Sequence, residues 1–206
     1  VDITNYVMLE LGQPLHAFDA KKVKGGLQIR RAGKDKELKT LDGVVRKLDP
    51  NDLVVADSSV PLALAGTMGG ESSEVTLATT EIALEAARFN ATAVAQNSRK
   101  HILSSEASRR LERGVDPTLA KISSARAAQL MIELGGAKIV GSAKAGKEVL
   151  PKKVKLNPAD ISNLLGLKVS DKVVKDSLKA VGCTVVGAAK SLTITRSEEH
   201  TSELQS

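Results

Sequence analysis

The sequence predicts a mixed α/β fold of the α+β type, in which most strands pair antiparallel, followed by a smaller module. Three observations lead to this prediction. Short strand-like segments separated by glycine-rich turns occupy the first part of the chain. Segments with helical periodicity stand before and after them. A stretch of small and basic residues at 141–153 has the composition of a linker, and beyond it the pattern restarts on a smaller scale.

The chain opens with a predicted helix over residues 2–11. Ile3, Val7 and Leu11 share one helical face, and Gly12 stands where a left-handed residue commonly ends a helix. The spacing therefore predicts an amphipathic helix with a defined end.

Strand signals follow this helix. Asp42-Gly43, between two apolar runs, is typical of a hairpin turn. The stretch at 63–76, which contains Gly66, Gly69 and Gly70, is interpreted as a glycine-rich turn. The predicted strands and strand pairs are 25–33, 38–49, 52–57 and 81–87.

Helices return after Asn90, which is predicted to cap a helix over residues 91–101. Asp116 and Pro117 are typical of a cap and a first helical position, and apolar residues continue at helical spacing up to Gly135.

In the second module, two short helices followed by a hairpin indicate a winged-helix-like fold. Its predicted elements are 154–156, 157–166, 170–182, 183–187 and 191–195.

Residues 196–206 match nothing before them in composition or periodicity. They resemble a translated sequencing adapter, so we treat them as a non-native tail and predict domains at 1–150 and 151–195, the second one truncated. Because the chain starts without methionine, inside an amphipathic stretch, we expect it to be a piece of a longer protein.

Composition excludes several classes of protein. A single cysteine, Cys183, in 206 residues excludes an internal disulfide and a cysteine zinc site. Such cysteine usage fits a reducing cytoplasm, where we expect the protein to lie. No apolar run approaches membrane-spanning length, so no membrane span is predicted. One tyrosine and two phenylalanines are too few for platforms that stack unpaired bases. The net charge of +6 suits a polyanionic partner, although scattered surface lysines are the commoner cause of such a balance.

The loop GTMGGE is not a phosphate-binding loop, because it lacks the lysine and hydroxyl residue of that motif and opens no apolar helix. Its glycines are expected to permit positive φ or the close approach of a chain or ligand. The sequence also lacks the serine nucleophile elbow, the HExxH motif and any paired His/Cys cluster, so no metal site is predicted.

Three polar features are candidates for a site, and each has a simpler interpretation. His16, beside Phe18 in LGQPLHAFD, is more often a hydrogen-bonded structural residue than a catalyst. Glu85 ends the apolar run IALE, where a carboxylate is costly unless it is paired or directed into a site; the alternative is a solvent-facing strand residue. The arginine-rich run at 104–117 fits either salt bridges within a helix or contacts with phosphates.

Four blocks of the sequence resemble consecutive motifs of the bacterial phenylalanyl-tRNA synthetase β subunit, and the resemblance extends over residues 1–195. These blocks are VDITNYVMLELGQPLHAFDA, LALAGTMGGE, IALEAARFN and SSEASRRLERGVDP. The resemblance implies an editing domain at 1–150 and the start of a winged-helix-like domain at 151–195. It further implies a cytoplasmic α2β2 heterotetramer that charges phenylalanine tRNA with the use of ATP and magnesium. The aminoacylation site belongs to the α subunit, so this fragment is expected to hold no cofactor and to require no DNA.

The editing domain of that family hydrolyses tyrosine wrongly joined to the phenylalanine tRNA. Carried over by motif, Glu85 is the glutamate that reads the tyrosine hydroxyl, and His16 is a catalytic candidate as the pocket histidine. Gly66 lets the ligand lie close to the backbone. The other carried-over positions are Thr4 and Asn5 in the opening motif, and Ser105 and Ala107 in place of a Thr-x-Ala pair. Arg109 and Arg113, from the arginine-rich run, are candidates for contacts with tRNA phosphates.

The sequence departs from the family at Ile102, where glycine is common, at Ser104, where histidine is frequent, and at Leu111, where an aromatic residue is usual. A bulky Ile102 is expected to reshape the loop that carries Ser105. Two functions therefore stay open: hydrolytic editing by an attacking water, or a non-catalytic tRNA-binding or subunit-assembly module with a decayed pocket. The role of His16, as a base or as a positioning group, is also open.

Overall fold

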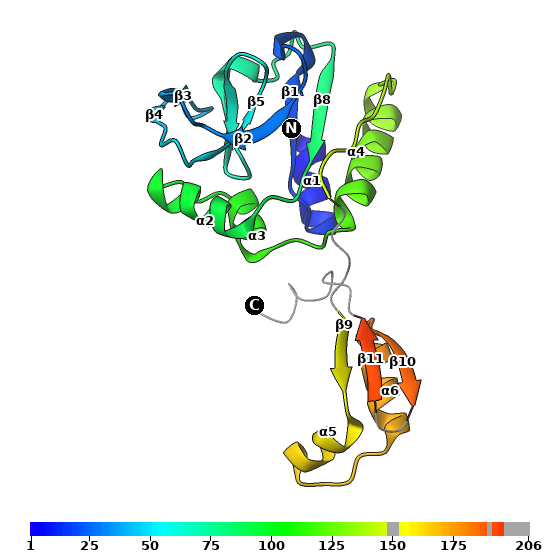
Figure 1. Ribbon diagram of the computed structural model, residues 1–206. Helices are drawn as coiled ribbons and strands as arrows, with labels where there is room; N and C mark the ends of the chain where they lie inside the picture. Colours follow the sequence, from blue (N-terminus) through cyan, green and yellow to red (C-terminus); the bar gives the residue numbers. More distant parts are fainter. Residues whose placement is uncertain (148–152, 189–190, 196–206) are drawn as a thin grey trace. The chain divides into compact units, whose positions relative to one another are not determined.

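The computed structural model describes residues 1–147, 153–188 and 191–195. These divide into two compact units, both drawn in Figure 1: unit 1 is Val1–Ala143, and unit 2 consists of the described residues from Lys144 onward. The predicted domain boundary between residues 150 and 151 and the predicted tail at 196–206 lie outside the described residues.

Unit 1 begins with the predicted helix, α1 (Asp2–Leu11). Gly12 ends it with φ +80°, and the Gly12 N–H donates to the Met8 carbonyl at 2.9 Å, which confirms the predicted stop. The chain then enters β1 (Leu15–Asp19), which pairs antiparallel with β8 (Ile82–Ala86). Figure 1 shows α1 and α4 (Leu119–Gly135) beside this strand pair.

A second, four-stranded antiparallel sheet contains β2 (Gln28–Arg31), β5 (Leu53–Ala56), β6 (Pro61–Leu64) and β7 (Met68–Gly69), in that order. The interpretation of residues 63–76 as one turn is therefore wrong at its start, where β6 and β7 enclose a turn of only three residues. Every residue of β6 is buried, so its sequence shows no alternation between apolar and polar positions. Short 3-10 helices at Ala20–Lys22 and Glu71–Ser73 complete this part of the chain.

The predicted hairpin is present as β3 (Glu37–Lys39) and β4 (Val45–Lys47). Its turn contains Gly43 at φ +77°, a conformation that the Asp-Gly pair was expected to supply. An isolated bridge between Thr40 and Gly70 joins the hairpin tip to the segment after β7.

Three helices close unit 1. Asn90 caps α2 (Ala91–Lys100) as predicted, with its side chain accepting from the Ala93 N–H at 3.0 Å. After α3 (Glu106–Arg113), α4 starts two residues later than predicted, because the Asp116 carboxylate accepts from the Thr118 N–H at 2.8 Å in the turn before it. The buried residues of α4 are Leu119, Ser123 and Ala127; by contrast Ile122 is 51% and Leu134 75% exposed.

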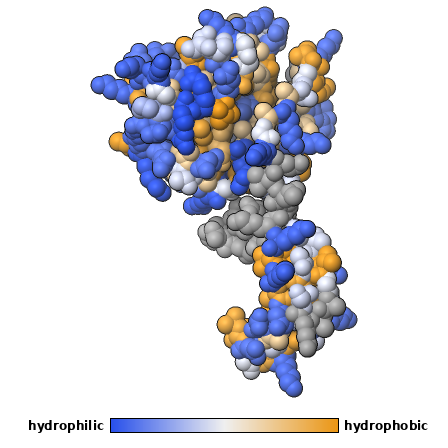
Figure 2. All heavy atoms as spheres, in the orientation of Figure 1, coloured by the Kyte–Doolittle hydropathy of each residue, from blue (hydrophilic) through white to orange (hydrophobic). Residues whose placement is uncertain are grey.

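The main core of unit 1 lies between the β1–β8 pair, the four-stranded sheet and helices α2 and α3. It consists of Phe18, Val55, Leu62, Ala63, Ala65, Phe89, Val94, Leu111 and Val115. Because Phe18 belongs to this core, the face of β1 that carries Phe18 is directed inward. Figure 2 shows hydrophilic side chains over most of the visible surface of unit 1, with hydrophobic ones grouped near its middle.

Unit 2 has the predicted order of strand, two helices and hairpin. It contains β9 (Lys153–Leu156), α5 (Pro158–Leu165), α6 (Asp171–Ala180), β10 (Thr184–Ala188) and β11 (Ser191–Thr195). The strands form an antiparallel sheet in the order β10-β11-β9, packed around a core that includes Val174, Cys183 and Leu192. In the described ranges of both units, no helix is long and apolar enough to span a membrane.

Candidate functional site

His16 and Glu85 lie directly opposite each other on β1 and β8. Residues in such a register place their side chains on the same face of the sheet, with Cβ atoms about 5 Å apart. That face also carries Phe18, because residues two apart in a strand point the same way. The imidazole of His16 meets the Phe18 ring edge-on, with ring centroids 4.5 Å apart and planes at 80°. The fold thus brings together two residues that the family resemblance assigned to one pocket.

The carboxyl group of Glu85 is isolated. Glu85 is half-buried, and its side chain has no hydrogen-bond or ion-pair partner among the described residues. Burial raises the pKa of the Glu85 carboxyl from 4.5 to about 7. A desolvated carboxyl without a partner is costly to keep, and such perturbed groups gather at functional sites. The environment therefore fits a group directed into a site better than a solvent-facing strand residue.

His16 is also half-buried, and burial lowers the pKa of its imidazole below 6.5. The ring is consequently neutral at pH 7, and a neutral imidazole is able to accept a proton or to orient a water molecule. Within the described part of the chain its nitrogens have no hydrogen-bond partner. This differs from the hydrogen-bonded structural histidine that the residues alone favoured.

Gly69 was not predicted as a site residue, but the close approach expected at the glycines of GTMGGE occurs there. A Cβ added to Gly69 would lie 2.6 Å from Cε1 and 2.8 Å from Nε2 of His16, so the imidazole rests directly on the glycine backbone. Gly70 is similarly enclosed, with the Leu62 carbonyl oxygen 2.5 Å from the corresponding position. A pair of glycines in or beside a buried strand indicates close approach of another group, and this signal was available in the sequence.

Gly66 adopts φ +67°, as a turn between two strands requires. A Cβ at this position would lie 3.0 Å from side-chain atoms of both Leu111 and Val94, so the glycine also permits helix packing. The next carbonyl, that of Thr67, accepts from the Ser105 hydroxyl at 2.9 Å. Gly66 and Ser105 are therefore neighbours, while their contact with a ligand stays a prediction.

The other predicted site residues are less closely associated with His16 and Glu85. Ser105 caps α3, and Ala107 is half-buried in the first turn of that helix. Thr4 is buried in α1, where its hydroxyl donates to the Val1 carbonyl at 2.6 Å, and Asn5 is exposed. No hydrogen bond between described residues joins Thr4 or Asn5 to His16 or Glu85.

Arg109 and Arg113, the two arginines predicted to contact tRNA, lie on the exposed side of α3. Arg109 donates to Ser104 Oγ at 3.0 Å and to Glu106 at 3.2 Å, which is the pattern expected for salt bridges within one helix. Arg113 is exposed in the last turn of α3. Their contact with tRNA stays a prediction.

Ile102 ends α2 in a conformation that normally belongs to glycine. Its φ is +53°, the one positive φ of a non-glycine residue in the described ranges. The Leu103 N–H donates to the Ser98 carbonyl and the Ile102 N–H to the Arg99 carbonyl, which together form a Schellman motif. The Ile102 side chain is 92% exposed, so it points away from the loop and leaves Ser105 at the start of α3. The reshaping of the loop by Ile102 stays a prediction, and the positive φ places backbone strain at this residue.

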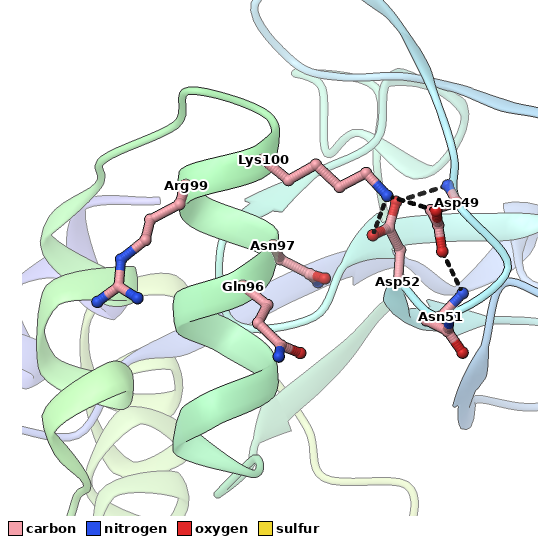
Figure 3. A pocket seen from close by; sticks show the side chains of 7 residues that line it. All are labelled: Asp49, Asn51, Asp52, Gln96, Asn97, Arg99 and Lys100. Carbon is pink, nitrogen blue, oxygen red and sulfur yellow. Dashed lines mark hydrogen bonds and ion pairs between the residues drawn. The ribbon is translucent and has the colours of Figure 1, made fainter.

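A polar cleft of about 430 Å³ lies elsewhere in unit 1, and no predicted site residue lines it. It is formed by Asp49, Asn51, Asp52, Gln96, Asn97, Arg99 and Lys100. In Figure 3, Lys100 reaches toward Asp49 and Asp52, whereas Arg99 points away from them. The Lys100 ammonium lies 2.8 Å from the Asp49 carboxylate and 3.6 Å from that of Asp52. Since these charges neutralise one another, the cleft is better explained as an ion-pair network than as a ligand site.

His101 belongs to the same network, since its Nε2 lies 2.8 Å from the buried carboxylate of Asp52. In the parts of the chain that the structure describes, no group of three or more His, Cys, Asp or Glu residues is placed to hold a metal ion. The chemistry available near His16 is therefore that of a neutral imidazole and a carboxyl group.

The comparisons with known proteins agree with the motif resemblance. The family model of the B3/4 domain matches residues 1–136. A phenylalanine–tRNA ligase beta subunit from Thermobifida fusca is 43% identical over 196 residues, which make up 95% of this chain and 24% of that protein. One from Cutibacterium acnes is 47% identical over 193 residues, which make up 93% of this chain and 23% of that protein. The chain thus spans about a quarter of the length of these curated relatives.

A solved structure, an N-terminal fragment of the phenylalanyl-tRNA synthetase beta-subunit from Pyrococcus horikoshii, aligns with a TM-score of 0.42 and 13% identity over 94% of this chain and 58% of that one. The family model covers more than half of the chain, and nearly all of unit 1. The chain therefore belongs to the B3/4 domain family, and the resemblance to the phenylalanyl-tRNA synthetase β subunit that its motifs predicted is confirmed.

Proposed function

We propose that unit 1 is an editing domain, which hydrolyses the ester bond of tyrosine wrongly attached to phenylalanine tRNA. One observation carries this proposal: the desolvated carboxyl group of Glu85, which has no partner among the described residues, lies directly opposite the neutral imidazole of His16. The first group is suited to recognise a hydroxyl, and the second to handle a water molecule or a proton.

The selectivity follows from the unpaired state of Glu85. Tyrosine is phenylalanine with one added hydroxyl, and an apolar pocket rejects an added hydroxyl only on the order of a hundredfold. A pocket built around a hydrogen-bond acceptor inverts this preference. The phenol donates a hydrogen bond to the Glu85 carboxyl. Phenylalanine leaves this acceptor unpaired, so the pocket discriminates against phenylalanine by roughly 10⁴-fold.

The hydrolytic step needs no covalent intermediate on the protein. Water adds to the ester carbonyl, the bond from the carbonyl carbon to the ribose oxygen breaks, and the proton released by water ends on that oxygen. The Ser105 hydroxyl is already donated to the Thr67 carbonyl, and no described base contacts it, so a serine nucleophile is disfavoured. His16 is the group placed to orient the water or accept its proton.

The larger assembly is part of the proposal. As the family resemblance implies, the chain acts within a cytoplasmic heterotetramer of two α and two β subunits that binds phenylalanine tRNA and uses ATP and magnesium. The α subunit carries aminoacylation, so no cofactor is assigned to the residues of this chain.

A second candidate is a tRNA-binding or subunit-assembly module without hydrolytic activity. The strained Ile102 beside the predicted pocket and the exposed Arg109 and Arg113 favour it. In that case changing the arginines weakens RNA binding and flattens its salt dependence, while the ester bond stays intact.

The test supplies the 206-residue chain with tRNA that carries ester-linked tyrosine or phenylalanine. We expect faster release of tyrosine, loss of this release in Glu85→Ala, and retained release in the control Glu81→Gln, an exposed carboxylate just before the same strand. Equal inertness toward both substrates, in a chain that also fails to bind free tyrosine, would overturn the hydrolase proposal and leave the binding module.

Binding measurements provide a second, independent readout. A hydrogen bond from the phenol favours the charged form of the carboxyl, so tyrosine binding is expected to lower the pKa of Glu85 and to tighten as pH rises through about 7. Phenylalanine lacks the donor and should show no such dependence. In Glu85→Gln the pH dependence of tyrosine binding should disappear.

A further inference from the structure

The tip of the β3–β4 hairpin lies against the same glycine as His16. The Leu41 N–H donates to the Gly69 carbonyl at 3.0 Å. A Cβ added to Gly69 would lie 3.0 Å from Leu41 Cδ1, compared with 2.6 Å from the His16 imidazole. A leucine methyl group and the imidazole therefore flank one glycine α-carbon, although no family motif quoted for this chain includes the leucine.

The backbone on either side of Leu41 is firmly held. Thr40 is fully buried, and its hydroxyl donates to the Asp42 carboxylate at 2.6 Å. Arg46 donates to the Thr40 hydroxyl at 2.9 Å and forms an ion pair with Asp42. A second nitrogen of Arg46 donates to the His101 carbonyl at 2.9 Å, which ties the hairpin tip to the loop that leads to Ser105. The position of Leu41 is thus determined by the fold.

Despite this anchoring, the Leu41 side chain is 42% exposed. Fixed apolar side chains with free surface beside perturbed polar groups are typical of the walls of ligand pockets. We infer that Leu41 is a substrate-binding residue that packs against the aromatic ring of the aminoacyl group whose hydroxyl Glu85 reads. This inference rests on the proposed function, because it assigns a further contact to the same pocket.

The two residues then have separable roles. Tyrosine and phenylalanine share the same ring faces, so Leu41 contributes equally to binding both amino acids. Glu85 contacts only the hydroxyl, so it determines the ratio of the affinities for tyrosine and phenylalanine. Loss of Leu41 should weaken binding without changing selectivity, and loss of the Glu85 charge should change selectivity.

The experiment titrates the 206-residue chain with L-tyrosine and L-phenylalanine and measures release of tyrosine from mischarged tRNA. In Leu41→Ala we expect both affinities to fall roughly tenfold at an unchanged ratio, and KM for release to rise with kcat unchanged. Leu41→Met keeps an apolar side chain of similar volume and should stay near wild type. Val45→Ala is the matched control, since Val45 is an apolar residue of the same hairpin and is 55% exposed.

The pKa of His16, measured without ligand, tests whether Leu41 lies close to the imidazole. Because Leu41 helps to exclude water from His16, the pKa of His16 should rise toward its ordinary value in Leu41→Ala and stay unchanged in Val45→Ala. If wild type binds or releases tyrosine and Leu41→Ala does so equally well, this inference alone is overturned. If Leu41→Ala changes the tyrosine to phenylalanine ratio, separate roles are excluded. A wild-type chain that neither binds nor releases tyrosine overturns the proposed function and this inference with it.

Discussion

Replacing Glu85 by glutamine removes a charge that the fold holds at a cost. Burial raises the pKa of this carboxyl from 4.5 to about 7, so between these pH values the folded chain binds a proton that the unfolded chain does not. The contribution of Glu85 to stability is therefore greatest at low pH and declines as pH rises from 4.5 to 7. At 1.36 kcal/mol per pKa unit, its decline between pH 5 and pH 8 amounts to about 2.5 kcal/mol.

The assay is urea unfolding at several pH values between 5 and 8, followed by NMR signals of unit 1 so that unit 2 does not contribute. His16 on the facing strand titrates as well, and burial lowers its pKa, so its own contribution to stability is lost as pH falls below 6.5. For this reason the informative quantity is the difference between wild type and Glu85→Gln, in which the His16 contribution largely cancels.

Glu85→Gln should gain stability relative to wild type by about 2.5 kcal/mol as pH rises from 5 to 8, whatever constant offset the buried amide adds. The control Glu81→Gln, an exposed carboxylate, should show a difference that stays within about 0.5 kcal/mol over the same range. A difference for Glu85→Gln that is equally flat would refute the argument that the carboxyl is desolvated. Direct titration of the Glu85 carboxyl by NMR, with a result near 4.5, would refute it too.

Three further substitutions test other parts of unit 1. Ile102→Gly should stabilise the chain by about 0.5–1 kcal/mol in urea unfolding, because it relieves a positive φ at an exposed position; Ile102→Ala keeps a Cβ and should gain much less. Gly69→Ala should displace the His16 ring, with changed His16 chemical shifts and weaker tyrosine binding, and unchanged shifts would contradict the packing described. Asp52→Ala should cost about 2–4 kcal/mol because it leaves His101 and Lys100 without their buried acceptor, and a loss below 0.5 kcal/mol would show that the pair is dispensable.

Elements with local signals were predictable from the sequence. Gly12 ends α1, Asn90 caps α2, and Asp42-Gly43 turns the β3–β4 hairpin, because each depends on side-chain and backbone preferences within a few residues. The β6 strand was missed for the opposite reason. It is buried on both faces, so the alternation that identifies a strand is absent, and only its sheet neighbours determine its conformation.

The motifs of the sequence determined the family and the set of residues to be examined, His16 and Glu85 among them. Tertiary structure alone decided that these two face each other, because the register between β1 and β8 depends on packing between segments far apart in the chain. The same holds for Gly69 and Leu41, whose nearness to His16 comes from contacts between a sheet and a separate hairpin. Local preferences act over a few residues, whereas a pocket is assembled from distant ones, and burial among them is what raises the pKa of Glu85.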